Sequence, residues 1–282
     1  IQVIMGLSGS GKSTLIRHIN RLIEPTDGKL LVDGENVLAM TQRQLQEFRR
    51  SKASMVFQRF ALMPHRSVAE NVGYGLRIQG LRSEEAAKRS QRWIERVGLT
   101  GYENYYTSQL SGGMQQRVGL ARALATDAEI LLMDEPFSAL DPLIRMDMQE
   151  ILLDLQTELH KTIIFITHDL DEALRLGNSI AILRDGEVIQ VGTGQQIILR
   201  PGNDYIRDFT KEVNRGRILK VASIMNSGRP GSGPEIDGDM VLEDALQIVS
   251  KSGSDIAMVT NGGQPVGSIR LDEMISALSK NA

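Results

Sequence analysis

A glycine-rich segment close to the start of the chain constrains the fold more than any other feature. Residues Gly6–Ser13 match the pattern GxxxxGK[ST] in full. The apolar run Ile1–Met5 predicts a short buried strand before this segment. Apolar residues recur at helical spacing after it: Leu15, Ile16, Ile19, Leu22 and Ile23. We expect this helix to end at Glu24-Pro25.

A strand, a glycine-rich loop and a helix in this order predict a phosphate-binding loop. The glycines let successive backbone N–H groups point inward at phosphate oxygens, and the helix presents its positive end to the same anion. We expect the Lys12 ammonium to reach the β- and γ-phosphates and the Ser13 hydroxyl to hold Mg²⁺. The alternative is a Gly-Ser turn that happens to precede a lysine. The expected nucleotide contacts of the loop are Ser8, Gly9, Ser10, Gly11, Lys12, Ser13 and Thr14.

Two carboxylates end a second apolar run, Ile130–Met133. Asp134 is placed where a Mg²⁺ ligand belongs, because a strand end beside a phosphate loop supplies that ligand. Glu135 follows directly and is placed to orient and polarise an attacking water. The alternative, two exposed acids at a strand end, is disfavoured by the phosphate loop in the same chain.

A further anion-binding segment is expected at Leu110–Gln116, which opens a helix that continues through Ala125. Ser111, Gly112 and Gly113 stand at the start of that helix. Alone this is also the pattern of an ordinary helix cap. Two phosphate-binding segments in one chain favour an arrangement in which the second serves the ATP of a partner.

Composition narrows the class of protein. The 282 residues carry a formal net charge of −3, so no basic excess indicates a nucleic-acid partner. The absence of cysteine excludes disulfides and thiolate metal sites. No apolar run approaches the roughly 18–20 residues that span a bilayer.

Strands alternate with helices along most of the chain, which predicts an α/β fold with a largely parallel sheet covered on both faces. Asp141 is expected to cap a long helix that has Pro142 at its first position. The region from about 60 to 125 is mostly helical in pattern. The other predicted elements are the hairpins Gly28–Val37 and Asp185-Gly186 and the strands Ser54–Phe57 and Thr162–Ile166.

A composition shift at Arg200–Arg217 marks a linker. We place an ATPase domain at 1–200, a linker at 201–217 and a small α+β domain at 218–282. The expected elements of the small domain are a helix at Leu242–Val249, a strand at Ile256–Thr260, a turn at Asn261–Gly263, a strand at Val266–Arg270 and a helix at Leu271–Leu278.

Residues of about 1–200 resemble the nucleotide-binding subunit of ABC transporters. Gly6–Ser13 match the Walker A loop, Asp134 ends the Walker B strand, and Leu110–Gln115 match the signature motif, with Met114 where the family usually has glutamine. The resemblance implies a P-loop NTPase fold of ABC type with a helical subdomain at about 60–125. Further matches are Gln58 to the Q-loop glutamine, Ser138–Asp141 to the D-loop and His168 to the switch histidine.

The resemblance also implies a mechanism and partners. Two copies of the chain close on two ATP molecules, each held between the Walker loop of one copy and Ser111–Gly113 of the other. Glu135 polarises the water, His168 holds the γ-phosphate side, and Gln58 couples Mg²⁺ to transmembrane permease subunits. Asp141 is counted among the nucleotide-binding residues. An extracytoplasmic substrate-binding protein is an indirect partner, and the chain is expected at the cytoplasmic face of the inner membrane as a peripheral subunit.

Longer stretches narrow the resemblance to the ATPases of glycine betaine/proline importers. One departure is Pro136, where several of those ATPases have alanine. Importers of carnitine or choline stay open, as does a soluble ABC ATPase not involved in transport. The stretches that carry the match are Met5–Thr14, Asn20–Thr26, Met55–Gln58, Phe60–His65 and Phe137–Arg145.

The resemblance also gives expectations for the two ends of the chain. We expect an N-terminal segment with two strands and an adenine-stacking residue before Ile1. The tail resembles a single CBS repeat, whose alternative is a purely structural cap. Such repeats work in pairs, so the tails are expected to pair within the dimer. The ribose-binding pattern of nucleotide-binding repeats appears here only as Gly267, Arg270 and Glu273, without the hydroxyl-bearing residue.

The helical segment between Gln58 and Ser111 is the expected docking region for the membrane partner. It lies between the nucleotide-sensing glutamine and the trans phosphate tip. The candidate apolar contacts are Phe60, Leu62 and Met63, for which a core role is the alternative.

Overall fold

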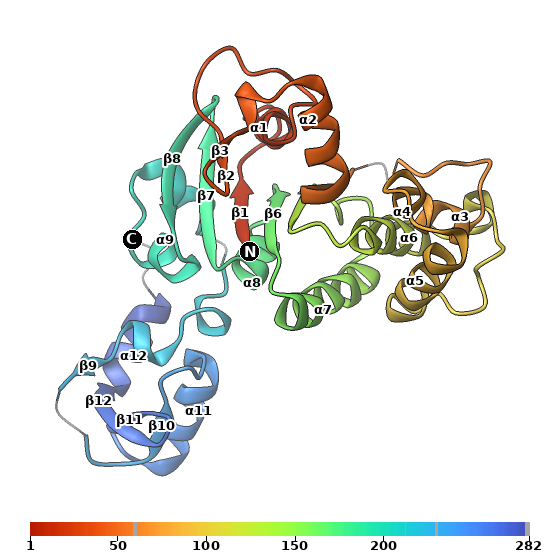
Figure 1. The fold of residues 1–282 in the computed structure, drawn as a ribbon. Helices are drawn as coiled ribbons and strands as arrows, with labels where there is room; N and C mark the ends of the chain where they lie inside the picture. The colour runs from red at the N-terminus through yellow and green to blue at the C-terminus, as the bar shows by residue number, and fades with distance from the viewer. Residues whose placement is uncertain (59–60, 212, 229–230, 280–282) are drawn as a thin grey trace. The chain divides into compact units, whose positions relative to one another are not determined.

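The computed structural model describes residues 1–58, 61–211, 213–228 and 231–279. The chain divides into two compact units, Ile1–Ile189 and Gln190–Ala282 (Figure 1). The division falls before residue 200, where the sequence suggested the end of the ATPase domain. Within the described ranges, no helix is both long and apolar enough to cross a membrane.

The first unit is built on a sheet of six strands, counted over the described residues, in the order β4-β5-β6-β1-β7-β8. The pairs β4–β5, β5–β6, β6–β1 and β1–β7 are parallel. The register places Ile4 beside Ile166 on one side and Ala181 on the other. The strands are β1 (Gln2–Met5), β4 (Ala53–Val56), β5 (Ile130–Asp134), β6 (Thr162–Thr167), β7 (Ser179–Arg184) and β8 (Glu187–Gly192).

Helices cover this sheet on both faces, as the apolar strands predicted (Figure 1). Successive residues of a strand point to opposite faces. Ile4 therefore packs with Ile16 of α1, and Val3 lies against Gly177 at the end of α8. The helices of the unit are α1 (Lys12–Ile19), α2 (Gln42–Glu47), α3 (Val68–Val72), α4 (Tyr74–Ile78), α5 (Ser83–Arg96), α6 (Gly112–Ala125), α7 (Pro142–Leu159) and α8 (Leu170–Leu176).

Short elements complete the first unit. The predicted hairpin forms, with Asp33 and Gly34 at φ of 51° and 83° in its turn. Asp185-Gly186 makes a similar turn between β7 and β8. The short elements are β2 (Leu31–Val32), β3 (Glu35–Asn36), the 3₁₀ helices η1 (Val37–Ala39) and η3 (Thr107–Gln109), and the π turn η2 (Phe48–Lys52).

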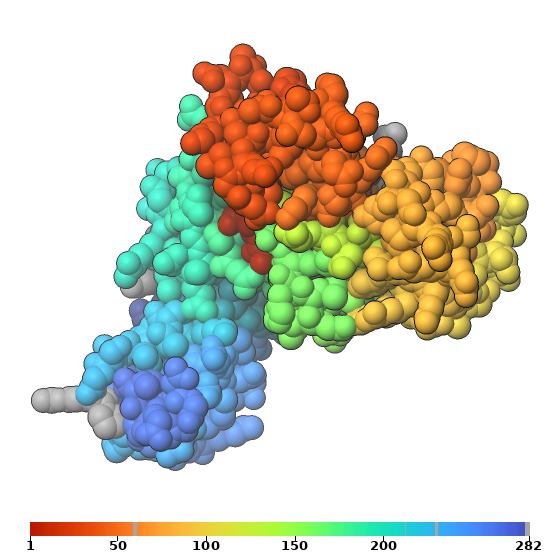
Figure 2. Space-filling model, in the orientation of Figure 1, coloured from red at the N-terminus to blue at the C-terminus, as the bar shows by residue number. Residues whose placement is uncertain are grey.

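Helices α3 to α6 gather into a lobe of the first unit, whose surface is gold to yellow-green in Figure 2. A capping box begins α3, because Ser67 accepts from the Glu70 amide while the Glu70 side chain accepts from the Ser67 amide. Buried Trp93 and Ile94 of α5 belong to the core of the unit. Leu62 and Met63 are half-buried, and Phe60 lies outside the described residues.

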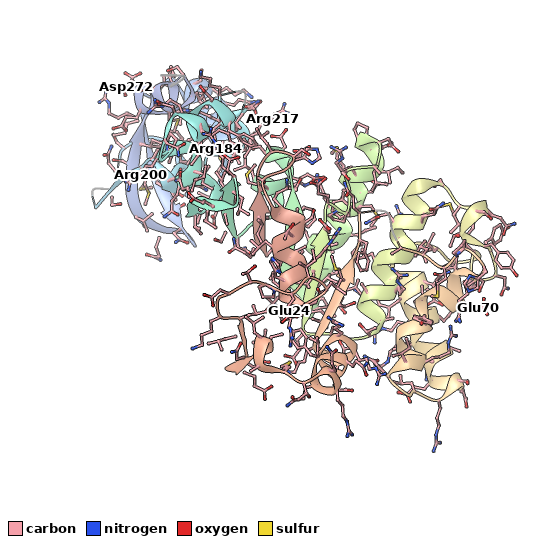
Figure 3. The ribbon with its side chains drawn as sticks, turned by 90° about the horizontal axis from the view of Figure 1, so that it is seen from above. Glu24, Glu70, Arg184, Arg200, Arg217 and Asp272 are labelled. Carbon is pink, nitrogen blue, oxygen red and sulfur yellow. The ribbon has the colours of Figure 1, made fainter. Side chains whose placement is uncertain are left out.

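The helix after the glycine-rich loop is shorter than its periodicity indicated. It ends at Ile19, and Leu22 and Ile23 are exposed rather than part of its buried face. The chain reverses at Arg21, where φ is 49°, and the Arg49 guanidinium donates to the carbonyls of Asn20 and Arg21. Side-chain donors thus satisfy the helix end well before the predicted stop at Pro25. Glu24, labelled in Figure 3, pairs with Arg21 at 2.9 Å.

The second unit holds a sheet of four strands, among the residues described, in the order β10-β11-β12-β9. The pair β10–β11 is parallel, and β12 is antiparallel to both β11 and β9. The predicted tail elements form close to their predicted bounds. The elements are α9 (Gly194–Leu199), α10 (Asp204–Phe209), η4 (Arg215–Arg217), η5 (Val221–Ser223), β9 (Asn226–Ser227), β10 (Glu235–Asp237), α11 (Leu242–Ser252), β11 (Ile256–Asn261), β12 (Gln264–Arg270) and α12 (Leu271–Ser279).

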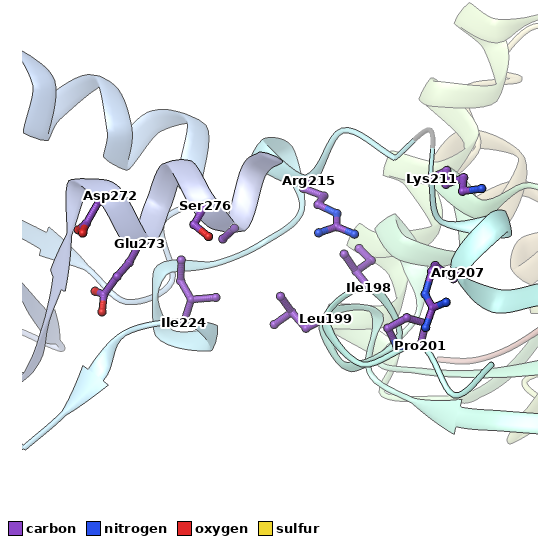
Figure 4. A pocket seen from close by; sticks show the side chains of 11 residues that line it. Ile198, Leu199, Pro201, Arg207, Lys211, Arg215, Ile224, Asp272, Glu273 and Ser276 are labelled. Carbon is purple, nitrogen blue, oxygen red and sulfur yellow. The ribbon is translucent and has the colours of Figure 1, made fainter. Parts of the chain in front are cut away.

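A cavity of about 740 Å³ lies within the second unit (Figure 4). Its lining combines basic side chains with acidic residues of α12. Two of the basic side chains are already paired, Arg207 with Asp204 and Lys211 with Asp208. The lining residues labelled in Figure 4 are Ile198, Leu199, Pro201, Arg207, Lys211, Arg215, Ile224, Asp272, Glu273 and Ser276.

The revised end of α1 predicts different stability effects for two apolar residues of similar size. Ile16 is fully buried, so we expect Ile16→Ala to destabilise the first unit by about 2–5 kcal/mol. Leu22 is 48% exposed, so we expect Leu22→Ala to change stability by less than about 1 kcal/mol. Urea unfolding of both variants, followed by tryptophan fluorescence, measures the difference. Equal losses would show that Leu22 is part of the core.

Candidate active site

The carboxyl ends of three neighbouring parallel strands lie side by side in the first sheet, and a predicted site residue lies at the end of each strand or directly after it. The loop Gly6–Gly11 follows β1, Asp134 ends β5, and His168 follows β6. The register places Asp134 beside Ile166 and Met5 beside Thr167. Residues predicted from separate motifs therefore meet at one place, the carboxyl end of the sheet, where α/β folds bind ligands.

The glycine-rich loop has the backbone of a phosphate cradle. Gly9 and Gly11 adopt φ of 84° and 94°, which glycine tolerates without strain. A Cβ at Gly6 would lie 2.3 Å from the Leu183 carbonyl oxygen, so only glycine fits there. Among the described residues the buried Ser10 hydroxyl has no hydrogen-bond partner. Ser8 and Gly9 are exposed at the tip of the loop, and Thr14 is exposed on α1.

Lys12 is the first residue of α1, and its side chain is only 4% exposed. The ammonium donates to the carbonyls of Gly6 at 2.8 Å and Leu7 at 3.0 Å. It also lies 3.6 Å from the Glu135 carboxylate. The lysine is thus held inside the loop by two carbonyls of the loop itself and by the Glu135 carboxylate.

Asp134 is fully buried and shares its two oxygens between residues of α1. The Ser13 hydroxyl donates to Oδ1 at 2.7 Å, and the Arg17 guanidinium donates to Oδ2 at 3.0 Å. A serine hydroxyl and a carboxylate this close are the oxygen ligands that Mg²⁺ takes alongside phosphates and water. The two side chains therefore fit a magnesium ion. Arg17 was not predicted, although it lies one helical turn after Ser13.

Glu135 is the centre of the site. Its Oε2 atom accepts from Gln58 Nε2 at 3.2 Å and lies 3.2 Å from His168 Nδ1. With Lys12 this brings together three side chains that the sequence placed in three separate motifs. The backbone of Glu135 has φ of 44°, a conformation that costs about 1–3 kcal/mol for a residue other than glycine. The Ile166 carbonyl accepts from its amide at 3.1 Å, and Ser138 Oγ donates to its carbonyl at 3.0 Å.

The Ser111–Gly113 segment forms the start of α6, as predicted. Ser111 caps the helix by accepting from the Met114 amide at 3.3 Å. A Cβ at Gly113 would lie 2.6 Å from Ile144 Cγ2, whereas Gly112 has open space around it. No hydrogen bond joins the described residues of this segment to the glycine-rich loop.

Asp141 caps α7, also as predicted, and accepts from the Ile144 amide at 3.1 Å. The residue four positions on, Arg145, escaped the sequence analysis as a site residue. Its guanidinium donates to the Leu140 carbonyl just before the cap. Only its helical spacing from Asp141 marks it in the sequence, and that spacing does not reveal its partners.

Comparison with known proteins gives the family. The model of the ABC transporter family matches residues 1–138. The glycine betaine transport ATP-binding protein OpuAA of Bacillus subtilis is 54% identical over 84% of this chain and 57% of its own length. The glycine betaine/carnitine transport ATP-binding protein GbuA of Listeria monocytogenes is 50% identical over 100% of this chain and 70% of its own. The chain thus spans little more than half of the first of these relatives.

A solved structure agrees with these relatives. It is the dimeric structure of a post-hydrolysis state of an ATP-binding cassette bound to ADP and Pi. It is 37% identical, has a TM-score of 0.64, and covers 69% of this chain and 85% of its own. With the phosphate loop, the paired carboxylates and the Ser111–Gly113 cap described above, these likenesses show that the chain belongs to the ABC transporter family, as one of its ATP-binding proteins.

Proposed function

We propose that this chain hydrolyses MgATP and so powers import of glycine betaine, proline or a related quaternary ammonium osmoprotectant through separate membrane subunits. The observation that carries the ATPase proposal is the convergence of Lys12, Gln58 and His168 on Glu135. The likeness to OpuAA, a glycine betaine transport ATP-binding protein, and to GbuA, a glycine betaine/carnitine transport ATP-binding protein, supports the substrate class. Carnitine and choline stay within that class.

The nucleotide contacts follow from the loop. Its backbone N–H groups and the start of α1 would hold the β- and γ-phosphates, and Lys12 would turn from the Gly6 and Leu7 carbonyls to phosphate oxygens. Ser13, Asp134 and Gln58 are the proposed holders of Mg²⁺. When bound, the ion offsets negative charge on the phosphates. Phosphoryl transfer to water needs mainly positioning of the reacting groups and charge stabilisation. The residues at the carboxyl end of the sheet would supply both.

Glu135 would accept a hydrogen bond from the attacking water and aim it at the γ-phosphate. His168 would lie on the γ-phosphate side, since its ring already contacts the carboxylate that orients the water. Gln58 contacts the same carboxylate and leads into the helical lobe. It is therefore placed to report occupancy of the site to whatever binds that lobe.

A second copy of the chain would complete the site. The start of α6 offers Ser111 and two glycines, and the 14-residue helix behind them carries a dipole that favours anions. Among the described residues, no hydrogen bond joins this segment to the phosphate loop of its own chain. We therefore assign Ser111–Gly113 to the ATP held by the partner, with the D-loop around Asp141 beside it. The dimeric cassette among the similar structures supports this arrangement.

The membrane subunits would dock on the helical lobe. Clustered exposed apolar side chains mark interaction surfaces more often than scattered ones do. Cross-linking from this lobe to a permease subunit would support the assignment, whereas cross-links confined to the second unit would contradict it. Such docking implies a peripheral place at the cytoplasmic face of the membrane, with a substrate-binding protein as an indirect partner. The exposed apolar residues of the lobe are Tyr74, Ile78, Tyr102, Tyr105 and Tyr106.

A soluble ABC ATPase without a transport role is the second candidate. The two candidates differ in the proteins that bind the chain, because only a transport ATPase needs a membrane partner. Affinity purification of the chain from detergent-solubilised membranes, with mass spectrometry of what remains bound, separates the two. Recovery of permease subunits supports transport, and recovery of ribosomal or repair proteins alone would support the alternative.

Residues 218–282, the CBS-like part of the second unit, would act as a regulatory tail that pairs with the tail of the other copy, as such repeats do. Nucleotide binding at its ribose-like pattern receives no support from the contacts. Both oxygens of Glu273 are engaged, by Asn226 Nδ2 at 2.8 Å and by the Arg270 amide at 3.0 Å. A Cβ at Gly267 would meet the Asn226 carbonyl at 2.4 Å, so the glycine serves strand packing.

We predict that Glu135→Gln keeps ATP binding and lowers the hydrolysis rate by about 10²-fold or more, because only the group that orients water is lost. In proteoliposomes with the membrane subunits and the binding protein, uptake of radiolabelled glycine betaine should fall by the same factor. The matched control is Glu129→Gln, at an exposed glutamate just before β5 that pairs with Lys52. Hydrolysis near the parent rate in Glu135→Gln would overturn its role.

We also predict that tail pairing controls the response to ionic strength. Ile275 of α12 is 50% exposed, and placing a charge there should separate paired tails without unfolding the unit. In the assembled transporter, Ile275→Glu should keep the hydrolysis rate at low salt and flatten its change with added salt. Val188→Glu, at an exposed valine of β8, is the control. A salt response identical to the parent would leave the tail without this role.

A further inference from the structure

We propose that Arg145 is a positioning residue that ties the D-loop to the segment carrying His168, so that the two move as one body. Arg145 lies in the first turn of α7, and its side chain is 27% exposed. One terminal guanidinium nitrogen, Nη2, donates to the Leu140 carbonyl at 3.1 Å. The other terminal nitrogen, Nη1, donates to Asp169 Oδ2 at 3.2 Å. A planar guanidinium can make both bonds at once because its donors form a fixed fork.

The Asp169 end of this link fixes the backbone on both sides of His168. Asp169 Oδ1 accepts from the Glu172 amide at 3.1 Å and so caps α8. The Asp169 amide donates to Thr167 Oγ1 at 2.9 Å, and that hydroxyl donates to Glu172 Oε2 at 2.6 Å. The residues before and after His168 are therefore anchored to one group of side chains, and Arg145 and Gln149 are the members that come from α7.

At its Leu140 end, the link made by Arg145 holds the turn that follows Glu135. The Leu140 amide donates to the Phe137 carbonyl at 3.1 Å, and the buried Phe137 ring packs against Phe165 of β6 at 5.5 Å between centroids. Because Glu135 and His168 already touch at 3.2 Å, Arg145 closes a ring of contacts around them. The Arg145 side chain therefore joins the D-loop directly to the residue that follows His168.

Asp169 is the charged partner that matters in this link. Glu172 also lies near Arg145, but at 3.8 Å from Nε it is farther away than Asp169, and burial raises the pKa of its carboxyl. Glu172 is instead held by Thr167 and by Gln149 Nε2 at 3.2 Å. The ion pair between Arg145 and Asp169 is partly buried on both sides, where it is screened less than a surface pair.

Among the described residues, no hydrogen bond or ion pair of Arg145 involves either of the predicted phosphate-binding segments, so its loss should act on catalysis through geometry. We expect Arg145→Gln, in the complete protein with its membrane subunits, to lower kcat for ATP about tenfold or more, since small misplacements of catalytic groups have effects of this order. The KM for ATP should change by less than about threefold, because the phosphate loop is untouched. Arg145→Lys should lie between, since an ammonium cannot reproduce the fork.

A double-mutant cycle shows whether Arg145 acts through Asp169. Asp169→Asn keeps an oxygen to cap α8 and removes the charge that faces Arg145, so it should lower kcat in the same direction. The double variant should be no slower than the slower single variant, because the second change finds the link already broken. Fully additive losses would contradict the proposal.

The matched control is Arg96→Gln, which breaks another arginine–carboxylate pair involving α7, with Glu158. It should leave kcat and KM at the parent values. Parent kcat in Arg145→Gln would overturn the proposal. So would a loss of ATP binding that accompanies the loss of kcat, since it would assign Arg145 a purely structural role. If Arg145→Gln does not fold, Arg145→Lys and Asp169→Asn provide the same comparison.

Discussion

The rest of the site depends on the contacts that the Glu135 carboxylate makes with its neighbours. It sits in a backbone conformation that strains a side-chain-bearing residue, and hydrogen bonds from Ser138 and to Ile166 hold it there. Its side chain contacts residues that follow two different strands and one that begins α1. In the proposed reaction, a carboxylate so constrained by its neighbours would be oriented before ATP binds, and preorganisation of this kind is a main source of catalytic rate.

The parallel sheet explains why the site forms at all. Strands β5, β6 and β1 lie side by side, so the residues at their carboxyl ends meet at one end of the sheet, although the glycine-rich loop is more than a hundred positions from Asp134 and His168 in the sequence. The sheet is apolar on both faces and is covered by α1 on one side and α8 on the other. Because the sheet is covered on both faces, a few polar contacts at its carboxyl end suffice to hold the side chains of the site within hydrogen-bond distance of one another.

The motifs made most of this site predictable from sequence. The pattern of Gly6–Ser13 fixes a strand, a loop and a helix, and the apolar run before Asp134 fixes a strand end. Pairwise contacts were not predictable, because the positions of Arg17 and Arg145 show helical spacing but not the partners across the fold. The end of α1 was mispredicted for a similar reason. Its apolar periodicity continues to Ile23, whereas distant Arg49 bonds to the carbonyls where the chain reverses.

In the proposed dimer, the Glu135 site would be one half of a complete ATPase site, with Ser111 of a second copy in the other half. The direct test mixes a Lys12→Ala chain with a Ser111→Arg chain in the assembled transporter and measures ATP hydrolysis. If the halves come from different copies, a mixed dimer contains one site with both lesions and one intact site. Hydrolysis should then exceed that of either pure dimer. Activity no higher than the pure dimers would mean that each chain completes its own site, contrary to this account.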